Sequence, residues 1–229
     1  MDRTQLSRAV QGLREVERPT LVLISPLPDP PPDRVALLAG SFDPITVAHD
    51  ALAAAALTQA DLVLLVYSVR TLPKEGSSPD PLLAESDRLD ALTRFARSRP
   101  GLAVALASHG LLADQAAAAR DRFPDAELLL AMGSDKVLQL LDPVWYPDRD
   151  ATLQRLFEEA RVLYTVREGD HQRLAAALAA PENAGWGDRF EPLPVPPEVA
   201  AVSSRLVRER RAAGLDVGHL VPPDLRPQA

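Results

Sequence analysis

The stretch Gly-Ser-Phe-Asp-Pro-Ile-Thr-Val-Ala-His-Asp, residues 40–50, decides how we expect this chain to fold. It follows an apolar run at 35–39, which predicts a buried β-strand, and leads into an alanine-rich stretch at 50–60, which predicts a helix. A glycine at a strand end lets the backbone approach a ligand closely, and the free N–H groups of a helix's first turn favour an anion. The sequence therefore predicts a phosphate-binding corner between strand and helix.

Two polar side chains stand at this corner. Thr46 and His49 are three residues apart, so on a helix they share a face and an imidazole and a hydroxyl point toward the same phosphate. The alternative is an ordinary strand-to-helix turn, in which His49 is a partly buried residue at the start of the helix.

The rest of the chain alternates in the same way. Further short apolar strands are predicted at 62–67, 102–107, 127–131 and 162–166, separated by helices near 49–60, 83–98, 110–122 and 150–160. Continuous apolar strands divided by helices imply a parallel sheet covered on both faces. We therefore predict a doubly wound, Rossmann-like α/β fold, whose ligands lie beyond the carboxyl ends of the strands.

The domain plan has three parts. Residues 1–33 form an N-terminal extension with a helix at 1–18 and a strand at 21–25, and 34–223 form the main domain. Residues 224–229 are a short C-terminal tail. The loop at 71–81, rich in Gly, Ser and Pro, is expected to be a mobile flap over the ligand edge.

Composition excludes several classes of protein. A net charge of −7 and an aromatic content of 4% argue against a nucleic-acid surface, which needs basic and stacking groups. The chain has no cysteine, which removes disulfides, thiolate catalysis and zinc–sulfur sites. We find neither a signal peptide nor a membrane-spanning run, so we expect a cytoplasmic protein with no membrane partner. The oligomeric state stays open, with a homo-oligomer as one option.

A second constellation follows the strand at 127–131. Gly133 ends that strand in a turn, and the carboxylate of Asp135 can accept hydrogen bonds from ribose hydroxyls or a base amine. The alternative is a helix N-cap at Ser134 with Asp135 in the favourable first turn.

A third constellation lies near the C-terminus. Ser203 and Ser204 begin a helix and can offer hydroxyl and N–H groups to an anion. Arg208 lies one turn beyond Ser204, where its guanidinium can grip a phosphate with two hydrogen bonds. The alternative is a capped, basic helix that faces solvent.

Together these motifs resemble the nucleotidylyltransferase superfamily over roughly residues 34–223. Residues 40–49 resemble its Gly-[Ser/Thr]-Phe-Asp-Pro turn followed by [Thr/His]-x-Gly-His, with Ala48 in place of the glycine, which narrows the room for a nucleotide. Residues 133–135 resemble the Gly-x-Asp motif of nicotinamide- and nicotinate-mononucleotide adenylyltransferases, and 203–208 their Ser-Ser-Thr-x-Ile-Arg motif with Arg205 in place of Thr. The Ser-Tyr-Thr motif common in bacterial nicotinate enzymes is absent at 109–115, so the acceptor pocket is not of their type.

The resemblance implies transfer of AMP from ATP, carrying Mg²⁺, to nicotinamide or nicotinate mononucleotide, with release of pyrophosphate for NAD biosynthesis. It implies catalytic roles for Thr46, His49 and Arg208 and no metal site on the protein. The implied nucleotide-binding residues are Gly40, Ser41, Phe42, Gly133, Asp135, Ser203 and Ser204, and the implied acceptor-binding residues are Lys74 and Trp145. The alternatives are transfer to another phosphorylated acceptor, such as phosphopantetheine, or a nucleotide-binding relative without turnover.

Overall fold

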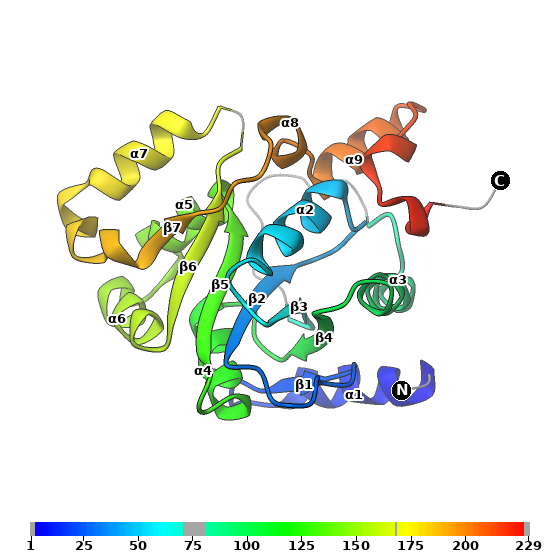
Figure 1. The fold of residues 1–229 in the computed structure, drawn as a ribbon, viewed down its shortest axis with the longest axis horizontal. Helices are drawn as coiled ribbons and strands as arrows, with labels where there is room; N and C mark the ends of the chain where they lie inside the picture. Colours follow the sequence, from blue (N-terminus) through cyan, green and yellow to red (C-terminus); the bar gives the residue numbers. More distant parts are fainter. Residues whose placement is uncertain (1–2, 71–80, 168, 227–229) are drawn as a thin grey trace.

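The strands form one mixed sheet in a computed structural model that describes residues 3–70, 81–167 and 169–226. The strands are β1 (Leu21–Leu23), β2 (Arg34–Gly40), β3 (Leu62–Ser68), β4 (Leu102–Ala107), β5 (Glu127–Gly133), β6 (Ala160–Thr165) and β7 (Phe190–Pro192). Their order in the sheet is β1-β4-β3-β2-β5-β6-β7 (Figure 1). All neighbours pair in parallel except β1, which runs antiparallel to β4. The predicted Rossmann-like α/β fold is confirmed.

Helices cover both faces of this sheet. One face carries α1 (Arg3–Glu15), α2 (Val47–Ala56) and α3 (Glu85–Arg97); the other carries α4 (Leu112–Arg122), α5 (Ser134–Leu141), α6 (Arg149–Glu159) and α7 (His171–Ala179). The chain ends with α8 (Pro197–Ala200) and α9 (Ser204–Ala212), and its 3-10 turns are η1 (Pro143–Trp145), η2 (Pro181–Arg189), η3 (Gly218–Leu220) and η4 (Pro223–Leu225).

The alternation of side chains along each strand builds two separate cores. In β2, Ala36 and Leu38 pack with α1, α2 and α3, whereas Val35 and Leu37 pack with α4 to α7. Because both faces are covered, the inner strands are apolar at nearly every position, as a sheet buried on two sides requires.

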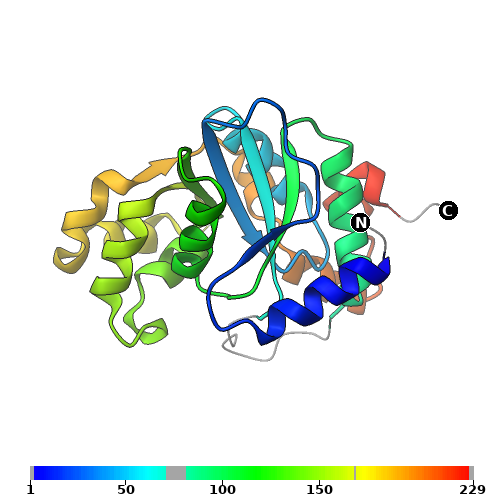
Figure 2. The ribbon, with the colours of Figure 1, turned by 90° about the horizontal axis from the view of Figure 1, so that it is seen from below.

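The N-terminal extension belongs to this sheet and core. Its helix α1 runs beside α3 (Figure 2). Arg14 of α1 donates a hydrogen bond to the carboxylate of Glu85 in α3 at 2.9 Å. Leu6 and Val10 of α1 are buried in the core of that face, and β1 extends the sheet. The predicted C-terminal tail is likewise docked at its start, because Asp224 accepts hydrogen bonds from Arg99 at 3.0 Å.

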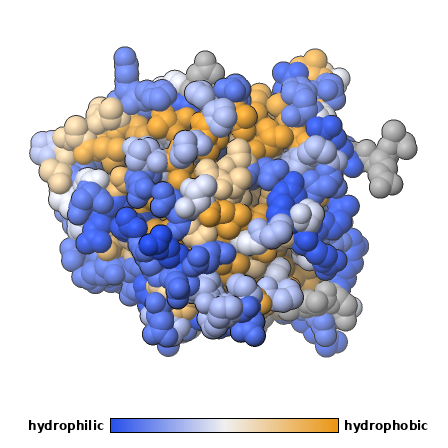
Figure 3. Space-filling view, in the orientation of Figure 1, coloured by the Kyte–Doolittle hydropathy of each residue, from blue (hydrophilic) through white to orange (hydrophobic). Residues whose placement is uncertain are grey.

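Several elements were not expected from the sequence. These are α7, the 3-10 turns, α8 and the edge strand β7, and the antiparallel direction of β1 also differs from an all-parallel sheet. Apolar side chains gather in a band over α7, β7 and α2, and alanines are frequent in the two helices (Figure 3). The predicted flap at 71–81 lies outside the described residues except for Pro81.

Candidate functional site

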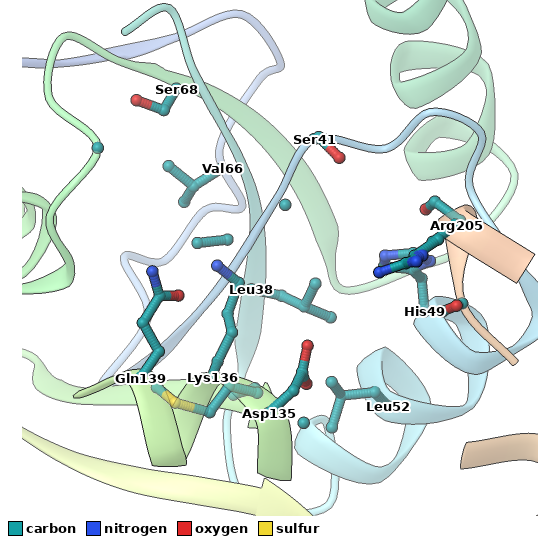
Figure 4. A pocket seen from close by; sticks show the side chains of 18 of the residues that line it. Leu38, Ser41, His49, Leu52, Val66, Ser68, Asp135, Lys136, Gln139 and Arg205 are labelled. Carbon is teal, nitrogen blue, oxygen red and sulfur yellow. The ribbon is translucent and has the colours of Figure 1, made fainter. Parts of the chain in front are cut away.

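A cavity of about 530 Å³ opens where the inner strands end. Its floor is the carboxyl end of β2 with Gly40, beside the ends of β3 and β5. The starts of four helices surround it, namely α2, α4, α5 and α9. Figure 4 shows Ser68 and Gln139 on one side of the cavity and His49 and Arg205 on the other. This is the edge at which a doubly wound fold binds its ligands.

His49 lines the cavity in the first turn of α2, and its ring is held by Thr46. The backbone N–H of Thr46 donates to His49 Nδ1 at 3.0 Å, and the Thr46 hydroxyl lies 2.8 Å from the same nitrogen. Nδ1 is therefore an acceptor, so the proton of the neutral ring sits on Nε2. Burial, and then the nearby charges of Arg167 and Lys136, lower the pKa of His49 to about 4. At neutral pH the ring is a neutral donor through Nε2.

Two residues predicted to touch the ligand lie behind the cavity wall instead. Thr46 is fully buried and does not line the cavity, because its polar atoms turn to His49. Phe42 is also fully buried, with its ring centroid 5.2 Å from that of His49. A Cβ on Gly40 would lie 3.0 Å from the Phe42 ring, so Gly40 is small because Phe42 packs over it. Both residues position His49.

Arg208 is placed by a partner that sequence reasoning missed. Its Nη1 donates to the backbone oxygen of Asp43 at 2.7 Å and lies 3.7 Å from the Asp43 carboxylate, with both side chains buried. The same carboxylate accepts from the backbone N–H groups of Leu82 and Leu83 at 3.0 and 2.9 Å. Arg208 still lines the cavity. It therefore joins α9 to the turn after β2 at the cavity wall.

The start of α9 forms the adjoining part of the wall. The Ser203 hydroxyl caps the helix by accepting from Leu206 N at 3.1 Å, and the Ser204 hydroxyl donates to Pro44 O at 2.8 Å. Arg205 is 67% exposed and pairs with Glu209 at 2.7 Å. Ala48, which was expected to narrow the room for a nucleotide, packs against the apolar cluster beneath α9 and does not line the cavity.

The turn after β5 supplies a charged pair. Asp135 lies 3.4 Å from Arg167, and a Cβ on Gly133 would lie 2.7 Å from the Asp135 carboxylate. Gly133, rather than Ser134, occupies the N-cap position of α5, while the buried Ser134 hydroxyl donates to Asp170 at 2.7 Å. Asp135 is half-exposed to the cavity and available to a ligand.

The remaining wall is largely neutral. The half-buried Trp145 of η1 lines it, as do Ser41, Ser68, Gly110, Gln115 and Gln139. Of these, Gln115 and Gln139 were missed, because a single amide on a helix carries no sequence signal. Lys74, predicted to bind the acceptor, lies outside the described residues.

The charge of the wall favours an anionic ligand. Lys136, Arg167, Arg205 and Arg208 line the cavity together with one carboxylate, that of Asp135, in a protein whose net charge is −7. Within the described ranges, no group of three or more His, Cys, Asp or Glu is arranged to hold a metal ion. In the same ranges, no helix has the length and apolar character needed to span a membrane.

A doubly wound sheet with a cationic cavity at its ligand edge is suited to binding phosphates, and comparison with known proteins gives the class. The chain belongs to the cytidylyltransferase-like family, whose model matches residues 37–210, and is a nucleotidyltransferase.

Curated relatives match across most of their length. The chain is 29% identical over 209 residues to a probable nicotinate-nucleotide adenylyltransferase of Chromohalobacter salexigens, covering 83% of this chain and 90% of the relative. It is 25% identical over 203 residues to a protein of the same name from Lachnoclostridium phytofermentans, covering 84% and 94%. Among solved structures, Plasmodium falciparum nicotinic acid mononucleotide adenylyltransferase complexed with APC superposes with a TM-score of 0.55 at 15% identity, over 83% of this chain and 91% of that chain. This last match supports the fold alone.

Proposed function

We propose that this protein transfers the AMP group of ATP to the phosphate of a pyridine mononucleotide and releases pyrophosphate. The observation that carries the proposal is the neutral, Nε2-protonated His49 in the wall of a cationic cavity. A neutral imidazole donor stabilises negative charge that develops on a phosphate oxygen and needs no proton exchange with solvent. The names of the two curated relatives support adenylyl transfer to a pyridine nucleotide.

The chemistry requires little of the protein beyond alignment. The acceptor phosphate is largely dianionic at neutral pH, because its second pKa is about 6, so no general base is needed. Attack on the α-phosphorus forms the new P–O bond while the bond to the pyrophosphate oxygen breaks. Charge then builds on the transferring group and the leaving oxygens, where hydrogen-bond donors lower the barrier.

His49 and the first N–H groups of α9 are the donors that we assign to the triphosphate. Asp135 is assigned to the ribose hydroxyls and Trp145 to the pyridine ring. Mg²⁺ would arrive on the triphosphate oxygens and neutralise part of their charge, as it does when few protein carboxylates are offered.

Pyrophosphate release tests this proposal. Purified protein is incubated with Mg-ATP and, in turn, nicotinamide mononucleotide, nicotinate mononucleotide and phosphopantetheine, with product identified by mass. We expect a dinucleotide from a pyridine mononucleotide. Turnover with phosphopantetheine alone would show that the acceptor is not a pyridine mononucleotide. ATP binding without turnover on any of the three acceptors would indicate a nucleotide-binding protein that does not catalyse this reaction.

A further inference from the structure

Gln115 is a buried amide in the cavity wall with one end satisfied and one end not. It lies in the first half of α4, is 3% exposed, and lines the cavity next to Gly110. Its Nε2 donates to His109 O at 3.0 Å and approaches Gly110 O at 3.5 Å. Two carbonyl oxygens can accept only from the NH₂ end of an amide, so these contacts fix which end of Gln115 is nitrogen.

The other end, Oε1, has no donor within the part of the chain that the structure describes. A buried acceptor left without a donor lowers the stability of the folded protein by about 1–3 kcal/mol, and such atoms are therefore rare. Because Gln115 lines the cavity, a ligand there is a candidate donor to Oε1.

The described hydrogen-bond partners of Gln115 carry no formal charge. They are the backbone oxygens of His109 and Gly110, and Gly110 also lines the cavity. Arg70 lies nearby, but its Nε donates to Ser108 O at 2.7 Å, and it does not line the cavity. The cationic side chains of the wall come instead from α5, the turn after β6, and α9.

We infer that Gln115 Oε1 accepts a hydrogen bond from the carboxamide N–H of the acceptor, and so selects nicotinamide mononucleotide over nicotinate mononucleotide. The inference rests on the proposed adenylyl transfer. A carboxamide brings N–H donors to Oε1, whereas a carboxylate at neutral pH brings only acceptor oxygens, which a carbonyl-type oxygen repels. Oε1 is covered in this structure, so the wall must open at Gln115 for the carboxamide to reach it.

This preference differs from the nicotinate in the names of the two relatives, which share 29% and 25% of their aligned residues with the chain. A site built to hydrogen-bond one substrate group rejects an analogue that cannot make the bond, since the buried protein atom is then left unpaired. One such contact on Gln115 is enough to separate two acceptors that differ only in this group.

The test is the ratio of kcat/KM for the two mononucleotides at saturating Mg-ATP, in the wild type and in Gln115→Leu. We expect the wild type to favour nicotinamide mononucleotide by at least about tenfold, and Gln115→Leu to lose about 10- to 100-fold on that substrate with little change on the other. Gln115→Met, which keeps the length of the side chain, serves if Gln115→Leu fails to fold. Gln154→Leu is the matched control, since Gln154 is exposed on α6 and pairs with Glu158.

Each outcome decides the matter. A wild type that favours the nicotinate substrate, or a Gln115 variant that lowers both values equally, overturns the role of Gln115 and leaves the proposed adenylyl transfer intact. Turnover on neither pyridine nucleotide overturns both.

Discussion

The backbone N–H of Thr46 donates to Nδ1 of His49 at 3.0 Å, a contact made within one helical turn that sets the tautomer of the ring. Because Nδ1 accepts, the neutral imidazole presents Nε2–H, which is a donor suited to a phosphate oxygen. The contact is local in sequence, and it fixes which ring nitrogen of His49 can donate.

The first prediction follows from that donor. His49→Ala removes a contact that strengthens as charge develops, and one such donor is typically worth about 10²–10³ in kcat. We expect that loss in kcat with a much smaller change in the Kd for ATP. His171→Ala, at an exposed position at the start of α7, is the control and should keep wild-type kcat. A His49→Ala protein with full kcat and a lowered Tm would show that the residue is only structural.

The second prediction concerns pH. The pKa of His49 is about 4 in the folded protein, against 6.5 for an ordinary histidine, chiefly because of burial. Between these values the unfolded chain binds a proton that the folded chain does not, so the contribution of His49 to the free energy of unfolding is complete above pH 6.5 and falls as the pH drops toward 4.

We therefore expect the free energy of unfolding, measured by urea titration, to fall less for His49→Asn than for the wild type as the pH is lowered from 6.5 to 4. Other titrating groups are common to both proteins, so the difference between the two curves isolates His49. If the free energy of unfolding of both proteins fell equally with pH, the lowered pKa of His49 would be contradicted.

The third prediction concerns the buried pair of Arg208 and Asp43. Removing one partner of a buried ion pair leaves a buried charge without compensation, at a cost of about 3–5 kcal/mol. Arg208→Met should therefore lower the free energy of unfolding by that order as well as raise the KM for ATP. A residue that only binds phosphate would change KM and leave stability unaltered. The double variant with Asp43→Asn should recover part of the lost stability, and strict additivity would argue against the pairing.

The sequence predicts what depends on local pattern and misses what depends on distant contacts. The strand that ends at Gly40 and the helix that starts after Thr46 follow from apolar runs and a glycine turn over a few residues. Arg208 was expected to grip a phosphate, and its contact with Asp43 spans 165 positions, a distance that no single-sequence pattern encodes. The unpaired oxygen of Gln115 was missed for the same reason, since a lone amide on an alanine-rich helix gives no signal.

The fourth prediction tests why Gly40 has no side chain. A Cβ there would meet the Phe42 ring at 3.0 Å, and Phe42 is fully buried with a positive φ of 47°, so the ring has little room to retreat. Overpacking of this kind costs about 1–3 kcal/mol. Gly40→Ala should lower Tm and, because Phe42 packs on His49, also lower kcat. Gly12→Ala in α1, where a Cβ meets nothing within 4 Å, is the control and should keep both or gain slightly in stability.

The fifth prediction concerns Arg205, which stands where the resembling family has a threonine. Its side chain is 67% exposed, pairs with Glu209 at 2.7 Å and lines the cavity. An exposed charge contact is screened by solvent and is worth about 0–1 kcal/mol, less than the 1.4 kcal/mol that makes a tenfold difference in binding. Arg205→Thr should therefore raise the KM for ATP by less than tenfold and leave kcat nearly unchanged.

Arg211→Thr removes the same charge from the exposed far end of α9, away from the cavity, and serves as the matched control. A tenfold or larger rise in KM with Arg205→Thr, alongside an unchanged Arg211→Thr, would mean that Arg205 leaves Glu209 to bind the triphosphate directly.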